Sequence, residues 1–417
     1  MSENKKLAIL VGGGPAPGIN SVIGAAAIHA VRSGVEVLGI QDGFKWLLEG
    51  DASHVTLLTI ADTSRIHFRG GSTLGISRAN PTKTPELLAT CAATLDRLGV
   101  GMLITIGGDD TCFSASQLAK ASRGALRVVH VPKTIDNDLD LPDEISTFGF
   151  QTARHIGVEL VESLMVDAKT TARWYFVVAM GRKAGHLALG IGKAAGASLS
   201  LIPEEFPTRV RLATIADTLA AAILKRAAHT RPDGVAVLAE GLVEILAPED
   251  MEGLEGVERD EHGHIRIAEV DFGAIIKKAV QERLHALGNR TTIVAKNIGY
   301  ELRCADPIPF DLEYTRDLGF SAARYVIEGG TEALVSMQRG RFVPVPFASI
   351  MDPGTGRMRV RMVDIASDGY RIAHAYMLRL NAADIADRVE LAKLAAAAKL
   401  TPEAFEQRFG YLVNGKG

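Results

Sequence analysis

The feature that most constrains this chain is a pair of acidic loops, each of which follows a short apolar run. The first loop, GGDDT at residues 107–111, follows the run 102–106, and the second, PKTIDND at 132–138, follows the run 128–131. Such runs are typical of buried strands. Because ligands bind at the carboxyl ends of the strands of an open parallel sheet, we expect both loops to line one crevice. Carboxylates, a lysine and a threonine in this arrangement predict a divalent-metal and phosphate-transfer site.

The composition places the chain among soluble globular proteins and excludes several classes. With 417 residues, 47% hydrophobic and 23% charged, it is long enough for two or more α/β lobes. A net charge of -3 gives no reason to expect nucleic acid or a membrane surface as partner. The sequence contains no bilayer-spanning run and no secretory signal is expected at its start. Its three scattered cysteines exclude a disulfide framework or zinc motif and favour a cytoplasmic enzyme.

Strand and helix signals alternate along most of the chain, as the βαβ architecture requires. We expect strands at 7–11, 36–40, 102–106, 128–131, 173–179, 234–239 and 291–297, and helices at 22–31, 85–98, 150–168 and 213–228. The charged stretch 248–269 predicts a surface hairpin with its turn near His262 and Gly263. The alanine-rich tail from Ala382 predicts helices that pack or contact another subunit.

The glycine-rich segment 12–18, GGGPAPG, has the composition of a phosphate-binding loop. Glycines allow backbone N–H groups to approach an anion, and the helix that follows adds its positive N-terminus. The segment has neither a Walker A ending nor the G-x-G-x-x-G pattern. Taken alone, it fits a tight turn equally well.

The aspartates of the two loops are the candidate metal ligands and catalytic groups. Mg²⁺ prefers one or two carboxylates together with waters and phosphate oxygens, and Asp109 could reach a metal-bound phosphate because the glycines before it bring the backbone close to a ligand. The alternative, a cap of the following helix, needs only one aspartate. Asp136 and Asp138 are two residues apart on a segment expected to be extended, so their side chains should lie on one face. One carboxylate could act as the base toward a substrate hydroxyl, and the other could support the metal or Thr134. The alternative here is a hydrogen-bonded turn.

Three arginines at the ends of strands or glycine turns supply positive charge: Arg78, Arg182 and Arg303. Each alone would be an ordinary surface arginine, but together they fit a phosphorylated substrate.

From Gly12 to about Asp311 the chain resembles the phosphofructokinase family. The matching motifs are, in order, Gly13-Gly14 with Pro17-Gly18 and Asn20, Leu74-Gly75 with Arg78, Gly107-Gly108-Asp109, Thr134-Ile135-Asp136-Asn137-Asp138, Met180-Gly181-Arg182, Glu240, Gly299-Tyr300 with Arg303, and Pro307-x-Pro309-Phe310-Asp311. The resemblance implies two Rossmann-like α/β/α lobes with mainly parallel sheets and the active site in the cleft between them. It implies a lobe at 1–150 with the donor and metal loops, a second lobe at 151–310 with the sugar-phosphate site and a charged insertion at about 243–270, and a closing segment at 311–417.

The resemblance also implies roles. Asp136 would take the proton from the C1 hydroxyl of fructose 6-phosphate, Asp109 and Asp138 would hold Mg²⁺, and Thr134 would contact the sugar. Arg182 would act in catalysis as well as in binding. The implied substrate-binding residues also include Gly13, Arg78, Ile135, Met180, Gly181, Glu240, Tyr300, Glu301, Leu302, Arg303 and Arg173. Arg173 would reach a neighbouring subunit's site in a homodimer or homotetramer. Glu204 and Glu205 follow Pro203 where ATP-using relatives carry effector contacts, although surface carboxylates are the simpler interpretation.

Two residues decide the phosphoryl donor, because ATP-using family members resemble Gly-Gly-Asp-Gly and Pro-Gly-Thr-Ile-Asp-Asn-Asp at these loops. Here Asp110 and Lys133 replace the two glycines. A carboxylate would fill the space of a nucleotide's α-phosphate, and like charges at ~4 Å cost on the order of 4 kcal/mol at an effective dielectric of about 20. Lys133 would neutralise the leaving phosphate of pyrophosphate, which no nucleoside anchors.

The prediction is therefore reversible, Mg²⁺-dependent phosphoryl transfer from pyrophosphate to fructose 6-phosphate. The alternatives are an ATP-dependent kinase of the same fold, a kinase of another substrate class with a Gly-Gly-Asp loop, and a catalytically silent sugar-phosphate sensor. The sequence carries Thr134 to Asp138 and the Tyr300 and Arg303 pair, which kinases acting on NAD or lipids lack. It also carries both the base and the metal aspartates, which argues against a silent sensor.

Overall fold

The computed structural model describes residues 6–141, 145–207, 209–252, 270–352 and 358–413. The chain divides into two compact units: unit 1 comprises residues 1–153 and 300–361, and unit 2 comprises residues 154–299 and 362–417. The first of these divisions lies close to the lobe boundary expected at 150. The segment expected to close the fold, 311–417, is instead shared between the two units, because its first part supplies strands to unit 1 and its last part packs on unit 2.

Among the described residues, unit 1 is built on an eight-stranded, mostly parallel sheet with the order β12-β11-β5-β4-β1-β2-β3 and β6 beside β5. The strands are β1 (Lys6–Val11), β2 (Val37–Ile40), β3 (Val55–Leu57), β4 (Val100–Gly107), β5 (Arg127–Thr134), β6 (Phe148–Gly149), β11 (Ala333–Gln338) and β12 (Arg341–Pro346). Of the strands just named, β3 and β12 pair antiparallel with their neighbours and the others pair in parallel. The predicted α/β class with a mainly parallel sheet is confirmed.

The order of these strands defines where a ligand can bind in unit 1. The chain passes from β1 to β2 on one side and then returns to β4 on the other side of β1. The carboxyl ends of β1 and β4 therefore form a topological switch point, the usual ligand-binding position in an open α/β sheet. The glycine-rich segment and the first acidic loop follow these two strands.

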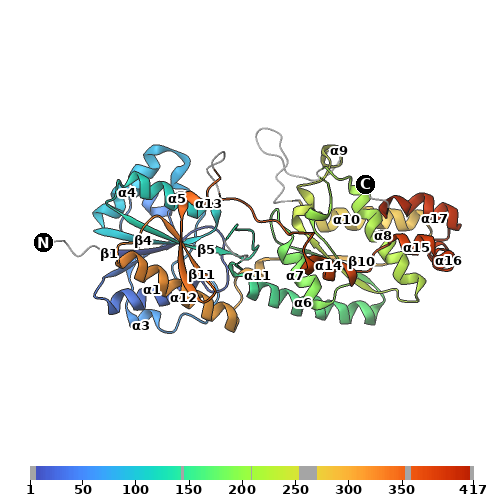
Figure 1. Ribbon diagram of the computed structural model, residues 1–417, viewed down its shortest axis with the longest axis horizontal. Coiled ribbons are helices and arrows are strands. Elements are labelled where there is room, and N and C mark those ends of the chain that lie inside the picture. The colour runs from blue at the N-terminus through green and yellow to red at the C-terminus, as the bar shows by residue number, and fades with distance from the viewer. Residues whose placement is uncertain (1–5, 142–144, 208, 253–269, 353–357, 414–417) are drawn as a thin grey trace. The chain divides into compact units, whose positions relative to one another are not determined.

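Helices cover both faces of this sheet (Figure 1). Helices α1 (Ile19–Arg32) and α12 (Pro309–Ile327) share one apolar core with it, and α4 (Pro85–Arg97) and α5 (Asp109–Ala121) share the other. Gly319 lets α12 approach α1 closely, because a Cβ there would lie 2.4 Å from the Val22 carbonyl oxygen. The short helices of unit 1 are α2 (Lys45–Leu48), α3 (Ile60–Thr63), η1 (Pro81–Lys83), α11 (Tyr300–Arg303) and α13 (Phe347–Ile350).

Unit 2 contains a parallel sheet with the order β10-β7-β9-β8. Its strands are β7 (Trp174–Ala179), β8 (Leu199–Leu201), β9 (Gly234–Ala239) and β10 (Ile293–Ile298), and its main helices are α6 (Phe150–Thr171, which begins in unit 1), α7 (His186–Ala195), α8 (Leu212–Ala228) and α10 (Phe272–Ala286). Helices α8 and α10 share a core with one face of the sheet. Helix α7 packs on the other face, where Gly192 lies against Val237. Shorter elements are η3 (Pro203–Glu205), η4 (Glu240–Val243) and α9 (Pro248–Glu252).

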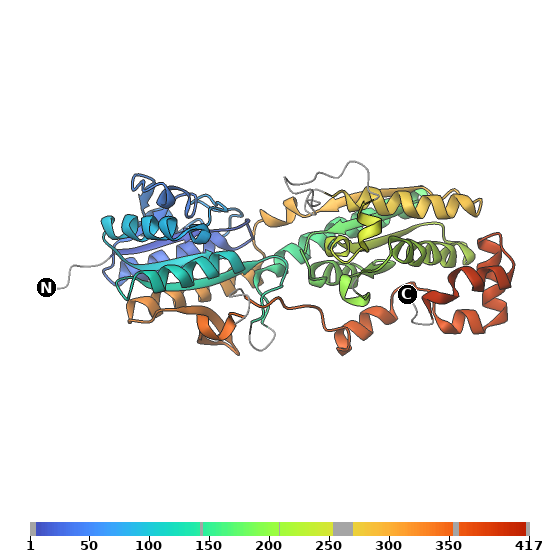
Figure 2. The ribbon, with the colours of Figure 1, turned by 90° about the horizontal axis from the view of Figure 1, so that it is seen from above.

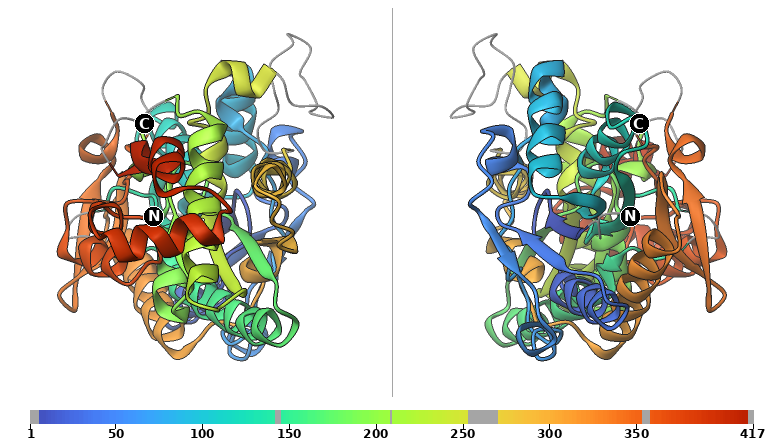
Figure 3. Two further views of the ribbon diagram at one scale, coloured as in Figure 1. Left: turned by 90° about the vertical axis from the view of Figure 1, so that its right-hand side faces the viewer. Right: turned by 90° about the vertical axis from the view of Figure 1, so that its left-hand side faces the viewer.

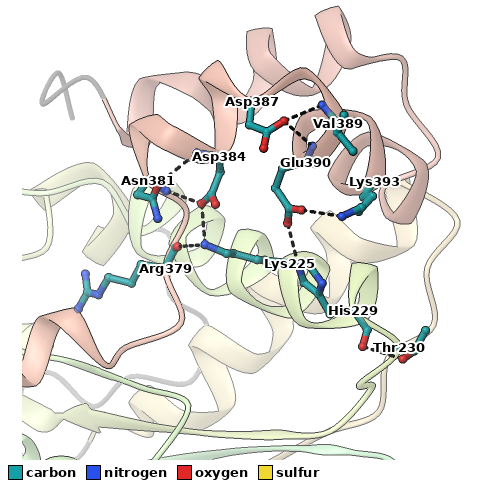
Figure 4. A network of polar contacts seen from close by, with 10 residues as sticks. All are labelled: Lys225, His229, Thr230, Arg379, Asn381, Asp384, Asp387, Val389, Glu390 and Lys393. Carbon is teal, nitrogen blue, oxygen red and sulfur yellow. Dashed lines mark hydrogen bonds and ion pairs between the residues drawn. The ribbon is translucent and has the colours of Figure 1, made fainter.

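The C-terminal part of the chain packs on unit 2, as the predicted helical tail allowed (Figure 2, Figure 3). It forms α14 (Asp368–Ala375), α15 (Ala382–Ala386), α16 (Arg388–Ala397), α17 (Pro402–Phe409) and η6 (Gly410–Leu412). Polar contacts fasten it to α8 (Figure 4). The Lys225 ammonium lies 2.6 Å from the Asp384 carboxylate and 2.9 Å from the Arg379 carbonyl oxygen, and the imidazole of His229 lies 2.7 Å from the Glu390 carboxylate.

The structure corrects the interpretation of Glu204 and Glu205 as surface carboxylates. The Glu205 side chain is 6% exposed and pairs with the guanidinium of Arg379 at 2.6 Å. Glu204 accepts hydrogen bonds from the backbone N–H groups of Gly185 and Val363, both at 2.9 Å. The returning C-terminal segment buries both carboxylates, an effect that local sequence could not reveal. Of the expected hairpin at 248–269, the first residues form α9, and its predicted turn with His262 and Gly263 lies outside the described residues.

The ion pair between Lys225 and Asp384 is expected to contribute to the free energy of unfolding. We expect Lys225→Met to lower the free energy of unfolding by about 2 kcal/mol, because it leaves a largely buried carboxylate without its cation. Lys393→Met is the matched control, since Lys393 is half exposed and its bond to Glu390 joins neighbouring turns of one helix; it should change stability by less than about 0.5 kcal/mol. Urea unfolding measures both. Equal losses would show that burial of the pair contributes nothing.

Candidate active site

The glycine-rich segment after β1 is held in place by backbone bonds. The amide of Gly12 donates to the Ile106 carbonyl at 2.9 Å, and that of Gly13 to the Ser77 carbonyl at 3.0 Å. These two N–H groups are therefore already engaged, which corrects the expectation that they would approach an anion. The Ser77 contact also places the 70–78 segment, with the predicted Arg78, beside this loop.

Thr111 explains why two of the glycines are needed. A Cβ on Gly12 would lie 2.5 Å from the Thr111 hydroxyl oxygen, and one on Gly107 would lie 2.3 Å from its Cβ. Real atoms do not approach so closely, so only glycine fits beside this side chain at either position. The two strand ends can then lie close together around Thr111, which is a packing reason for glycines that also resemble a phosphate loop.

The first acidic loop turns directly into helix α5. Asp109 and Asp110 occupy its first turn, and the capping residue is Gly108, which makes no side-chain hydrogen bond. The aspartates are thus not caps, and the helix N-terminus favours their negative charge. Asp109 is partly buried and Asp110 is exposed. Both lie at the topological switch point, where the sequence predicted them.

The second acidic loop is a bent turn rather than an extended segment. Asn137 has a φ of 57°, in the left-handed region, so the alternation of a strand does not apply and the expectation that Asp136 and Asp138 share one face for that reason is wrong. The alternative, a hydrogen-bonded turn, is present: the Asp136 amide donates to the Thr134 hydroxyl at 3.0 Å. Both carboxylate residues are buried, with 6% and 7% of their surface exposed.

An arginine that the sequence analysis missed holds this turn. The guanidinium of Arg361 donates to the Asn137 side-chain oxygen at 2.6 Å, to the Asn137 carbonyl at 3.0 Å and to the Ile145 carbonyl at 3.0 Å. The amide of Arg361 also donates to the Asp138 carbonyl at 2.8 Å. More than 200 residues separate Arg361 from the loop, and no motif surrounds it, so only the folded chain identifies its role.

Two cations lie beside the glycine-rich segment. The buried ammonium of Lys133 donates to the Gly14 carbonyl and lies 3.6 Å from the position of a Cβ on Gly13. The guanidinium carbon of Arg303 lies 3.6 Å from the corresponding position on Gly14. With two amides of the segment already bonded, these two positive side chains are the groups here that could attract an anion.

The predicted residues Tyr300, Glu301 and Leu302 belong to α11, with Arg303 at its end. Tyr300 is 78% exposed and its ring lies 5.5 Å from the Arg303 guanidinium. Leu302 and Ile135 are buried. Leu302 exposes none of its surface and Ile135 only 3%, so the structure gives neither a surface that a ligand could contact.

Unit 2 gathers another set of predicted residues at the carboxyl ends of three adjacent strands. Met180, Gly181 and Arg182 follow β7, Glu240 follows β9 and Gly299 follows β10. One oxygen of Glu240 accepts from the amides of Gly181 at 3.1 Å and Arg182 at 2.7 Å. Glu240 thus fixes the turn that carries Arg182, whose φ of 49° is left-handed.

Arg173 lies away from this set. It precedes β7, whereas Met180 follows that strand, and six residues at ~3.3 Å each separate the two by roughly 20 Å. Its guanidinium lies 3.9 Å from the Asp167 carboxylate. Within unit 2, Arg173 therefore does not join the predicted sugar-phosphate residues.

Asp311, the last residue of the sequence match, has a structural role. Its fully buried carboxylate accepts from the amide of Gly149 at 2.9 Å and from the amide and hydroxyl of Thr152 at 2.8 and 2.6 Å. These bonds satisfy donors at the start of α6. Burial raises the pKa of Asp311, although the hydrogen bonds from Thr152 and Gly149 oppose the shift.

The comparisons with known proteins agree with this architecture. A family model described as phosphofructokinase matches residues 6–326. The chain belongs to the phosphofructokinase family. The structure resembles a phosphofructokinase from Saccharomyces cerevisiae (TM-score 0.67, 20% identity, 98% of this chain and 50% of that one) and a pyrophosphate-dependent phosphofructokinase from Nitrosospira multiformis (TM-score 0.68, 16% identity, 91% and 93%). These likenesses concern the fold.

Two curated relatives align over almost their whole length. A pyrophosphate--fructose 6-phosphate 1-phosphotransferase from Thermotoga maritima is 52% identical over 97% of this chain and 98% of its own. One of the same name from Naegleria fowleri is 49% identical over 98% and 95%. An ATP-dependent 6-phosphofructokinase from Mycobacterium tuberculosis is 41% identical over 48% of this chain and 57% of its own.

The contacts of Arg361 predict a loss of turnover when they are removed. We expect Arg361→Met to lower kcat about 100-fold, because the turn that carries Asp136 and Asp138 would lose its main support and small displacements of reacting groups are costly. Arg359→Met, an exposed arginine two residues earlier, is the control and should remain near the parent. Steady-state kinetics with fructose 6-phosphate measure both. Equal kcat values for the two variants would contradict this role of Arg361.

Proposed function

We propose that the chain catalyses reversible phosphoryl transfer from inorganic pyrophosphate to the C1 hydroxyl of fructose 6-phosphate, giving fructose 1,6-bisphosphate and phosphate. The observation that carries the proposal is the near full-length match, at 52% identity, to a relative of that name. The ATP-dependent relative matches over only about half of each chain, so the comparison gives less support to ATP as the donor. Positions 110 and 133 support the same donor.

In the proposed reaction the carboxylate of Asp136 accepts the proton of the C1 hydroxyl. The C1 oxygen then bonds to the terminal phosphorus, the phosphoanhydride bond breaks and inorganic phosphate leaves. Lys133, buried against Gly14, stabilises charge on the leaving phosphate. Arg182, held by Glu240, and Arg303 bind phosphate oxygens of the sugar and donor. Because an anhydride is exchanged for an ester with release of phosphate, the reaction can run in either direction.

The residues fit a magnesium ion. Among the described residues no group of three or more histidine, cysteine or carboxylate side chains could hold a metal by itself. Mg²⁺ does not need such a group, because it binds through one or two carboxylates plus water and substrate phosphates. Asp109 at the start of α5 and Asp138 after β5, on neighbouring strands, would hold it. When bound, it would neutralise negative charge on the pyrophosphate.

Asp110 and Lys133 select the donor. Asp110 is exposed in the first turn of α5, so its carboxylate can meet a bound donor. A nucleotide would bring an additional negatively charged phosphate to that place, whereas pyrophosphate would not. Water reduces the repulsion of an exposed charge, so we expect size as well as charge to contribute.

We also propose a homodimer or homotetramer in which Arg173 reaches the site of a neighbouring subunit. Its position at the amino end of β7, away from Met180 and Arg182, supports this role. Sedimentation of the purified protein as a monomer would contradict it. No helix of the described chain combines the length and apolar character that crossing a bilayer requires.

Removing the base tests the chemistry. We expect Asp136→Ser to lower kcat at least 1,000-fold, within the range of about 100- to 10,000-fold that general bases contribute, while the KM for fructose 6-phosphate changes little. Asp140→Ser, an exposed aspartate of the same segment, is the control. Near-normal turnover of the Asp136 variant would exclude it as the base.

Donor choice is tested by kinetics with pyrophosphate, triphosphate and ATP in Mg²⁺. The parent should prefer pyrophosphate strongly, and the double variant Asp110→Gly, Lys133→Gly should gain measurable use of ATP while losing pyrophosphate turnover. Asp110→Asn, which removes the charge but keeps the size, separates repulsion from steric exclusion. A parent enzyme that uses ATP as well as pyrophosphate would overturn the donor assignment. An absence of phosphate release with every donor would favour a silent sensor.

A further inference from the structure

A fully buried histidine lies beneath the first acidic loop. His130 on β5 and Thr105 on β4 are partners in the parallel register, so their side chains lie on the same face of the sheet. Both are 0% exposed. That face carries the apolar core of α4 and α5, with Leu103, Val128 and Cys112. Thr105 and His130 are thus a polar pair within an apolar core, close to the carboxyl ends of β4 and β5.

The imidazole of His130 connects two parts of β4. Its Nδ1 atom lies 2.8 Å from the Thr105 hydroxyl oxygen, and its Nε2 atom lies 3.0 Å from the Gly107 carbonyl oxygen. Burial lowers the pKa of His130 to about 3, although the bond to Gly107 opposes the shift, so the ring is neutral near pH 7. A carbonyl oxygen can only accept. The single ring proton is therefore on Nε2 and donates to Gly107, and Nδ1 accepts from Thr105.

Packing alone does not explain a histidine here. An apolar side chain of similar size would fill the same space without burying two ring nitrogens, which are costly unless they are hydrogen bonded. What the histidine adds is a donor to the Gly107 carbonyl. In the parallel ladder the Gly107 carbonyl faces the amide of Lys133, the residue after its register partner Pro132, so His130 supplies a second donor that comes from a side chain. Gly107 also has no side chain of its own, because Thr111 occupies that space.

The position of this carbonyl determines how α5 begins. Gly107 is the last residue of β4, Gly108 is the cap, and Asp109 and Asp110 form the first turn. Rotation of the peptide group after Gly107 would change the direction of both carboxylates. From the same strand, Lys133 holds the other donor loop through the Gly14 carbonyl. Strand β5 therefore supports the first acidic loop through His130 and the glycine-rich segment through Lys133.

We propose that His130 is a positioning residue of the donor site, which holds the Gly107 carbonyl and thereby sets the affinity for Mg–pyrophosphate without affecting the sugar-phosphate site. This inference rests on the proposed function, because it concerns the donor of that reaction.

Two substitutions separate the bonds that His130 makes. His130→Asn can replace the nitrogen that faces Thr105 but is too short to reach Gly107, whereas His130→Gln can place an amide N–H near the position of Nε2. We expect the Asn variant to raise the Kd of Mg–pyrophosphate about tenfold, the effect of losing one positioned hydrogen bond, and the Gln variant to remain within about threefold of the parent. The KM for fructose 6-phosphate should be unchanged in both.

Isothermal titration of Mg–pyrophosphate into the full-length protein measures the Kd without turnover, and thermal unfolding reports stability. A lower Tm with an unchanged Kd would show a purely structural role and overturn the proposal, as would equal increases in the Kd and the sugar-phosphate KM. If the Asn variant does not fold, the same titration is carried out on Thr105→Val, which removes the hydroxyl that orients the His130 ring. An unchanged Kd of Mg–pyrophosphate in that variant would overturn the proposal. If the parent protein binds Mg–pyrophosphate but transfers no phosphate, the proposed function is wrong. The role of His130 is still tested in that case, because the titration does not depend on turnover.

Discussion

The parallel register of β1, β4 and β5 is the constraint on which the rest of unit 1 depends. It brings Val11 opposite Ile106 and Gly107 opposite Pro132, so that three strands end at one level. The loops that follow are then close enough for Thr111 to fill the space between two of them. Without this alignment, the glycine-rich segment, the aspartates of α5 and Lys133 would not belong to one site.

Several polar residues of the site regions form hydrogen bonds with the backbone. Arg361 holds the turn at Asn137, Glu240 holds the turn at Arg182, and Asp311 satisfies the start of α6. Such bonds limit the motion of loops whose conformations are otherwise unfavourable, including the left-handed Asn137 and Arg182. Phosphoryl transfer depends on positioning and electrostatic stabilisation, so residues that fix the reacting groups matter as much as those that touch substrate.

Most strands and helices could be predicted, because apolar runs bounded by glycine and charged residues identify them locally. The errors arose where distant segments meet. Glu204 and Glu205 are polar neighbours in sequence, yet the returning C-terminal segment buries them with Arg379 and Val363. The extended conformation expected for residues 136–138 failed because Arg361, far along the chain, stabilises a bent turn. Similarly, Gly12 and Gly13 have the composition of an anion loop, but their amides bond to neighbouring strands and segments.

The sequence by itself determined the fold class, the order of the elements and the residue types at the strand ends, since these follow from local periodicity and from ordered motifs. It also indicated the donor through Asp110 and Lys133, because charge and size are properties of single side chains. Only the tertiary structure decided which carboxylates are buried, which amides are already bonded and that His130, Arg361 and Glu240 support the loops. Those properties depend on hydrogen bonds and burial between segments distant in the chain, which no local pattern encodes.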